Sequence, residues 1–92
     1  MGGWVLRVVW PIEDDALFDH EAKRAARRDL PNVARDRAAV ICGRPKFTVV
    51  DVAPGTPLPR EWPPATTRVV VCEVPAKPAP ATAGALMERR AA

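Results

Sequence analysis

Alternating hydrophobic positions predict a first strand at residues 4–10. Side chains alternate along a strand, so one face carries four large apolar residues: Trp4, Leu6, Val8 and Trp10. The other face is also largely apolar, with Arg7 between two valines. This two-sided pattern is typical of a central strand, and we expect Pro11 to end it.

The next apolar positions recur with helical spacing. At 100° per residue, one side of the expected helix gathers Phe18, Ala22, Ala25, Ala26 and Leu30. Acidic residues precede it, and we expect Asp14 or Asp15 to be the N-cap. These carboxylates therefore have a capping role rather than a metal-binding one.

Pro31 leaves the continuation of this helix open. The helix either breaks there or restarts with Pro31 at a first helical position, runs from Asn32 to Ile41 and stops at Gly43. We favour the second helical segment. The alternative is a strand that begins within residues 38–42.

Two further strands are expected at residues 46–52 and 67–74, around the apolar runs FTVV and VVVC. Between them, residues 53–66 contain five prolines and suit neither a helix nor a central strand; we call them the proline loop. The compact domain is expected to cover residues 1–75. Residues 76–92, rich in proline and alanine, are expected to form an extended, mobile tail.

The order strand, helix, strand, long loop, strand predicts an α+β fold of the βαββ type. We expect a three-stranded sheet that the helix covers on one face. If the first two strands are parallel neighbours, the connection between them would cross over right-handed. The second and third strands would be antiparallel. Such a sheet leaves an open face and two edges, where a partner strand or a second copy could bind.

Composition narrows the setting. The 92 residues contain no Ser, Gln or Tyr, and use 11 Arg against 3 Lys. In this style, and in the stretch GRPKFTVVDVAPG, the chain resembles short uncharacterised proteins of GC-rich actinobacteria and their phages. No export signal or apolar run of 18 residues is present, so we expect a cytoplasmic protein. Cys42 and Cys72 are expected to be buried or half-buried free thiols, and a disulfide between them is the alternative.

Candidate catalytic chemistry is sparse. His20 is the single histidine and falls on the charged face of the expected helix. A zinc site wants four Cys or His ligands at close spacing, which the chain does not offer, and serine chemistry is excluded. We therefore expect no enzymatic activity, no metal and no cofactor.

Four basic residues mark the charged face of the helix, and we call them the basic face: Lys23, Arg24, Arg27 and Arg28. They could contact nucleic-acid phosphates. However, Asp19 precedes Lys23 by four residues and Glu21 precedes Arg24 by three, spacings at which helical side chains pair. Residues 13–37 hold seven acidic and six basic residues, and no aromatic is expected beside the stripe. Nucleic-acid binding is therefore the alternative function.

The proline loop is the leading candidate for a binding site. It presents Leu58, Arg60 and Trp62 among prolines, which reduce the entropy lost on binding. Trp is also enriched in interface hot spots. The competing interpretation is that Trp62 folds back over the open sheet face. We predict a small interaction module for a protein partner, such as a phage or accessory modulator of a host protein.

Overall fold

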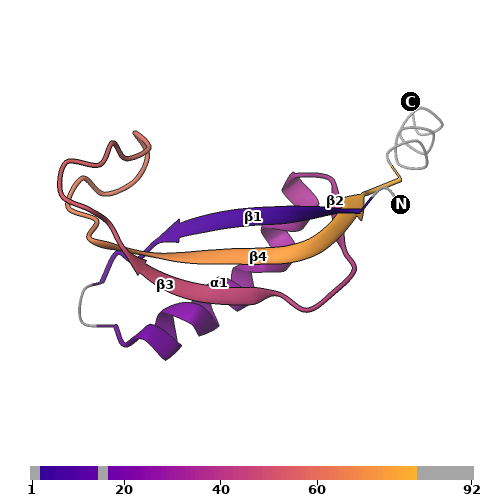
Figure 1. Ribbon diagram of the computed structural model, residues 1–92, viewed down its shortest axis with the longest axis horizontal. Helices are drawn as coiled ribbons and strands as arrows, with labels where there is room; N and C mark the ends of the chain where they lie inside the picture. Colours follow the sequence, from indigo (N-terminus) through magenta and orange to yellow (C-terminus); the bar gives the residue numbers. More distant parts are fainter. Residues whose placement is uncertain (1–2, 15–16, 81–92) are drawn as a thin grey trace, which may run out of the picture.

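The computed structural model describes residues 3–14 and 17–80. Along these residues the elements are β1 (Trp4–Pro11), α1 (Asp19–Asp36), β2 (Ala39–Ile41), β3 (Lys46–Asp51) and β4 (Arg68–Pro78). One helix packs against an antiparallel sheet (Figure 1). The predicted α+β class is confirmed.

The sheet is three strands wide, with β4 in the centre. On one side β4 pairs antiparallel with β1, from Trp4 opposite Ala76 to Pro11 opposite Val69. On its other side lie β2 and β3, end to end and both antiparallel to β4. The expected second and third strands form as β3 and β4, and the alternative strand within residues 38–42 forms as β2, which makes four strands. β1 and β3 run parallel but are not neighbours, because β4 lies between them.

Pro75 accounts for the gap between β2 and β3. The Cys42 N–H donates to the Pro75 carbonyl at 2.9 Å, so the backbone of Pro75 faces this edge. Pro75 has no N–H to offer there. Ile41 and Lys46 are five positions apart along the chain, whereas their partners Ala76 and Glu73 are three positions apart. A bulge therefore occupies the position where a ladder bond cannot form.

The helix begins later than the sequence indicates. Its N-cap is Phe18, not Asp14 or Asp15. The Glu21 carboxylate accepts a hydrogen bond from the Phe18 N–H at 3.0 Å, which is the backward half of a capping box. Because Glu21 supplies this contact from within the first turn, a polar residue at the N-cap itself is not required. Asp14 instead precedes the helix, where its carbonyl accepts a bond from the Leu17 N–H at 3.0 Å.

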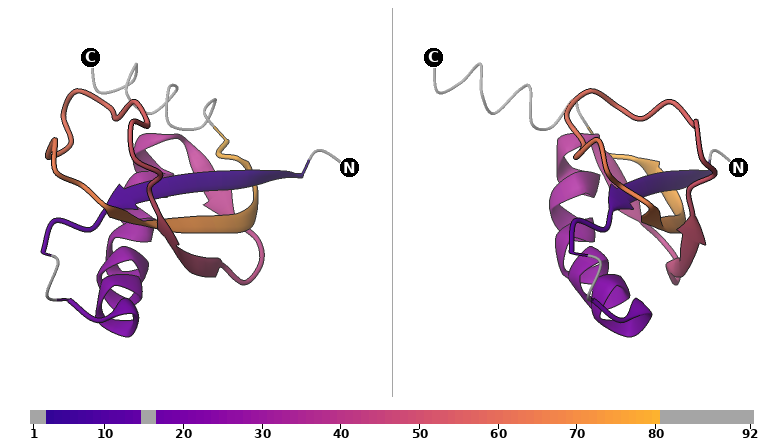
Figure 2. Two further views of the ribbon diagram at one scale, coloured as in Figure 1. Left: turned by 60° about the vertical axis from the view of Figure 1, so that its left-hand side comes forward. Right: turned by 90° about the vertical axis from the view of Figure 1, so that its left-hand side faces the viewer.

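α1 continues through Pro31, so the expected break is wrong. Pro31 lies on the exposed side, where the carbonyl that loses its partner can face water. The ribbon of α1 bends along its length (Figure 2), as expected of a helix with an internal proline. The favoured continuation to Ile41 is also wrong. Ala38 has a left-handed φ of 53° directly after the helix, and β2 follows.

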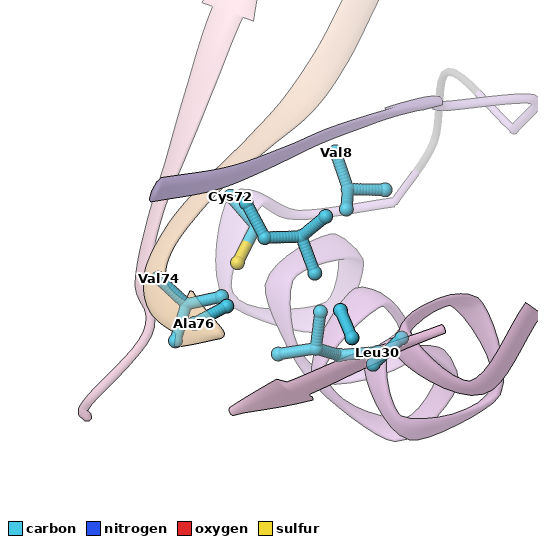
Figure 3. Close-up of a cluster of buried hydrophobic side chains, with 8 residues drawn as sticks. Val8, Leu30, Cys72, Val74 and Ala76 are labelled. Atoms are coloured by element: carbon cyan, nitrogen blue, oxygen red, sulfur yellow. The ribbon is translucent and has the colours of Figure 1, made fainter. Parts of the chain in front are cut away.

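The core lies between α1 and the sheet. Leu6, Val8 and the β4 residues Cys72, Val74 and Ala76 pack against Leu30 and Ala34 (Figure 3). A second cluster joins Ile12 and Val70 to Ala22 and Ala26. The predicted apolar sides of β1 and α1 therefore face each other, except that Trp4, Phe18 and Ala25 are exposed.

The compact domain extends beyond its predicted end. β4 runs to Pro78, and the side chain of Ala76 is fully buried. The predicted boundary at residue 75 therefore falls inside the central strand. The prolines of the sequence VPAKP indicate the end of a strand, but β4 continues through both of them. Residues 81–92 of the expected tail lie outside the described residues.

Candidate functional site

The proline loop is held by three consecutive turns. Pro54 and Gly55, with φ of +84° at the glycine, make the first turn, in which the Thr56 N–H and hydroxyl both donate to the Ala53 carbonyl. In the second, the Trp62 N–H donates to the Pro59 carbonyl at 3.1 Å. In the third, Thr66 bonds to Pro63 through its N–H and its hydroxyl. The loop projects from one end of the sheet (Figures 1 and 2).

The loop brings its three predicted binding residues together. Leu58, Arg60 and Trp62 line one hollow of about 390 Å³, whose remaining wall is Thr56, Pro59 and Pro64. Leu58 and Trp62 are half-buried and Arg60 is exposed. Within the part of the chain that the structure describes, all the lining residues belong to the proline loop. The hollow thus combines an aromatic ring, an aliphatic side chain and a guanidinium at the surface.

A second hollow, which the sequence did not indicate, lies beside Trp10. We call it the Trp10 groove; it has a volume of about 330 Å³ between the end of β1 and one flank of α1. Its apolar surface comes from Trp10, Ile12, Leu17, Val70 and three helix alanines, Ala22, Ala25 and Ala26. Its charged lining residues are Glu13, Asp14 and Asp29. No sequence pattern brings these together, since they come from β1, β4, α1 and the segment before α1.

Asp29 links the two walls of this groove. The indole Nε1–H of Trp10 donates to Asp29 Oδ2 at 2.8 Å, and Asn32 Nδ2 donates to Oδ1 at 3.4 Å. Both Trp10 and Asp29 are half-buried. A charge-assisted hydrogen bond in such a setting holds the indole ring in a defined orientation.

Asp19 and Glu21, the acidic residues next to the basic face, do not pair with its lysine and arginine side chains as the sequence predicts. Asp19 Oδ1 accepts a hydrogen bond from Arg68 at 3.2 Å, and Glu21 accepts the N-cap N–H. The expected pairs Asp19–Lys23 and Glu21–Arg24 are therefore absent from the described part of the chain. Tertiary and capping contacts outcompete the helical spacing because they satisfy groups that would otherwise lack a partner.

An aromatic ring does accompany the basic face, contrary to expectation. The guanidinium of Arg27 lies 4.9 Å from the centre of the Phe47 ring, and Phe47 lies 6.3 Å from Trp10. This cation–π contact holds the Arg27 side chain against β3. Arg27 is therefore engaged within the fold at the side of α1 that borders the sheet. Arg24 and Arg28 are exposed, and Lys23 is half-buried.

The titratable side chains that could form a nucleophilic pair lie at opposite ends of the fold. His20 stacks on Phe18 at the start of α1, with 5.9 Å between ring centres. Its neighbour Asp19 contacts Arg68, whereas Cys42 contacts Pro75, seven residues further along β4. At a strand rise of about 3.3 Å per residue, this separation is about 23 Å. A Cys42–His20 pair does not form.

The two cysteines are free, so the alternative disulfide is absent. Cys72 is fully buried as predicted, whereas Cys42 is exposed, contrary to the expectation that both are buried or half-buried. Burial raises the pKa of the Cys72 thiol above 9.0; Glu73 adds to this effect and Arg27 opposes it. Within residues 3–14 and 17–80, no group of three or more His, Cys, Asp or Glu residues is placed to hold a metal ion. None of the described helices is long and apolar enough to cross a membrane.

The outer edge of β1 has no strand partner among the described residues. Because the Ile12 N–H donates inward to Arg68, the neighbouring Pro11 faces outward, where a missing N–H costs no ladder bond. The Arg37 guanidinium donates to the outward carbonyl of Arg7 at 2.9 Å. Both features reduce the backbone groups that an added strand could use.

Comparison with protein-family models, curated proteins and solved structures found no match to this chain. The resemblance to actinobacterial and phage proteins therefore stays a prediction. Any functional proposal depends on the geometry of the described surfaces.

Proposed function

We propose that the chain is a small non-enzymatic interaction module that binds a protein partner through the proline loop. The observation that carries this proposal is that Leu58, Arg60 and Trp62 line a single hollow. Trp and Arg are the side chains most enriched in interface hot spots. A loop restrained by five prolines and three turns loses little entropy when it binds.

The lining of the hollow indicates the kind of segment that it would accept. Trp62, Leu58 and the prolines offer an apolar surface for one large side chain. Arg60 offers a guanidinium that can bind a carboxylate through two parallel hydrogen bonds. We therefore expect a partner segment in which an acidic residue lies next to an aromatic or aliphatic one.

A displayed peptide library, selected on the immobilised full chain, tests this proposal. Selected peptides should combine carboxylates with large apolar side chains. Trp62→Ala should weaken their binding by about 30-fold, the effect of losing a hot spot worth about 2 kcal/mol. Arg60→Glu should weaken binding further for the more acidic peptides.

Trp4→Ala is the matched control, because Trp4 is 40% exposed but lies on β1, opposite the far end of β4. It should leave peptide affinity unchanged. Equal binding to wild type and Trp62→Ala would contradict the proposal. Unfolding of Trp62→Ala would also contradict it, because Trp62 would then be a core residue.

A second candidate is binding of nucleic acid by the basic face. It is favoured by the finding that Asp19 and Glu21 bind groups outside the basic face. Within the described residues, Lys23, Arg24 and Arg28 form no ion pair. Phosphate contacts of this kind depend strongly on salt.

Fluorescence anisotropy with a labelled RNA and a labelled DNA oligonucleotide at two salt concentrations tests this candidate. Affinity should fall with salt, and Arg24→Glu or Arg28→Glu should weaken it. Arg44→Glu, outside α1, changes the net charge equally and serves as the control. Absence of binding at low salt would rule this candidate out.

As part of the main proposal, we also propose that the protein is cytoplasmic and that its protein partner is a host protein whose function it modulates. Two free thiols, one of them exposed, suit a reducing compartment. Self-association through the edge of β1 is a less favoured mode, because Pro11 and the Arg37 contact obstruct that edge.

A further inference from the structure

The Trp10 groove is a second potential binding site, distinct from the proposed function. It shares no lining residue with the hollow of the proline loop, and none with the basic face. Its volume of about 330 Å³ is within the range of small-ligand sites.

The packing of α1 explains why this space exists. The helix packs mainly on β2, β3 and β4, and leaves the end of β1 less covered. Where α1 approaches Trp10 and Ile12, its side chains are the small residues Ala22, Ala25 and Ala26. The base of the groove is buried and apolar, since Ile12, Val70 and Ala26 are almost fully enclosed.

The charge of the groove has one sign. Among the described residues, the charged side chains that line it are Glu13, Asp14 and Asp29, which are all acidic. The nearby Arg68 does not line it; this side chain bonds to Asp19 and to the Leu17 carbonyl. The Asp29 carboxylate accepts a hydrogen bond from the Trp10 indole at 2.8 Å, so a carboxylate and an aromatic ring meet where the α1 and β1 walls of the groove join.

We infer that the Trp10 groove binds an organic ammonium ion that carries an apolar body. The apolar base would take the body out of water. The ammonium group would lie near the carboxylates and the Trp10 ring, where charge attraction and cation–π contact act together. A neutral ligand of the same shape would gain only the apolar part, and an anion would be repelled.

A titration of the ¹⁵N-labelled full chain, followed by NMR at neutral pH, tests this inference with three ligands of similar size. These are 2-phenylethylammonium, neutral 2-phenylethanol and anionic 3-phenylpropionate. The ammonium ion should shift the Trp10 indole N–H signal and the backbone amides of Ala22, Ala25 and Ala26. Its affinity should exceed that of the alcohol by about fivefold or more, and the carboxylate should show no saturable shift.

Variants separate the site from other surfaces. Glu13→Gln combined with Asp29→Asn removes two of the three carboxylates but keeps an acceptor for Trp10, and should bring the ammonium affinity closer to that of the alcohol. Asp36→Asn, on α1 but outside the groove, should leave it unchanged. Ala25→Phe should fill the groove and abolish binding, whereas Arg35→Phe, on the exposed side of α1, should not.

Equal affinity for the ammonium ion and the alcohol would overturn the inference, and so would undiminished binding to Ala25→Phe. Ala25 is exposed, so this variant is expected to fold, and its NMR spectrum verifies that directly. If Ala25→Phe does not fold, the double variant that removes charge tests the inference independently. Peptide binding at the proline loop stays unaffected in either case.

Discussion

Gly43 and Pro75 lie so close together that residue 43 has no room for a side chain. A Cβ atom placed on Gly43 would lie 2.8 Å from Cγ of Pro75 and 3.2 Å from its Cβ and Cδ. The contact occurs at the bulge between β2 and β3, where Cys42 bonds to the Pro75 carbonyl. Glycine is thus required here for close approach rather than for a special φ angle.

Gly43→Ala should lower the free energy of unfolding by about 1–3 kcal/mol, the usual cost of forcing extra volume into a packed contact. Urea denaturation followed by circular dichroism measures it. Gly3→Ala is the control, because its Cβ would meet the Ala76 carbonyl oxygen at an ordinary van der Waals distance of 3.8 Å.

The steric origin of this effect can be isolated by a double-mutant cycle. In a Pro75→Ala background, Gly43→Ala should cost less than it does in the wild type, because the ring that it strikes has been removed. The same cost in both backgrounds would show that the Gly43–Pro75 contact is not the cause.

Ala38 adopts a left-handed conformation, with φ of 53°, directly after α1. Its N–H donates to the Arg35 carbonyl at 3.1 Å, as in a helix ending where glycine is preferred. Ala38→Gly should therefore raise the free energy of unfolding by about 0.5–1 kcal/mol. Ala25→Gly, inside the helix, should lower it by about 1 kcal/mol in the same denaturation experiment. Destabilisation by both variants would contradict this account of the turn.

At the scale of the element, α1 is a continuous 18-residue helix despite Pro31. Its buried positions recur every four residues at Ala22, Ala26, Leu30 and Ala34. This stripe packs against the sheet on both sides of the proline, so tertiary packing offsets the backbone hydrogen bond lost at Arg27.

Pro31→Ala should restore that bond and raise the free energy of unfolding by about 1–2 kcal/mol, which is less than the full cost of an interior proline because the unfolded chain gains freedom. Thermal and urea denaturation would measure the gain. Unchanged or lower stability would mean that the bend at Pro31 optimises packing on the sheet.

At the scale of the whole molecule, Cys72 reports on global opening. It lies in the middle of β4, fully buried beneath α1, while Cys42 is exposed. Thiol labelling in native buffer should modify Cys42 quickly and Cys72 only as fast as the protein unfolds. Fast labelling of both thiols would contradict this core arrangement.

Stability should also depend on pH through this thiol. Burial raises the pKa of Cys72 above 9.0, so at alkaline pH the native state keeps a proton that the unfolded chain releases. The contribution is fully present below pH 9.0 and declines as pH rises beyond it. Urea denaturation between pH 7 and 10, in a Cys42→Ala background, should show a steeper alkaline decline with Cys72 than with Cys72→Ala.

Much of the fold was predictable because apolar periodicity is a local property. The alternation at Trp4–Trp10, the spacing of Ala22, Ala26 and Leu30, and the runs FTVV and VVVC identified β1, the helix face, β3 and the middle of β4. The proline loop was also predictable, since proline excludes a regular element directly. Within the loop, the sequence predicted Leu58, Arg60 and Trp62 as one candidate binding site. It did not predict the hollow that these residues line together.

Only the tertiary structure decided which backbone and side-chain partners were available. Glu21 moved the helix start to Phe18, and strand pairing allowed β4 to continue past Pro75 into what local composition indicated was a tail. Asp19 forms its ion pair with Arg68 instead of Lys23. Asp29 accepts a hydrogen bond from Trp10, which lies 19 positions earlier in the sequence. Sequence periodicity therefore determined which faces are apolar, whereas contacts between distant residues determined where elements end and where charges and hollows lie. Those contacts depend on three-dimensional proximity, which a local pattern does not contain.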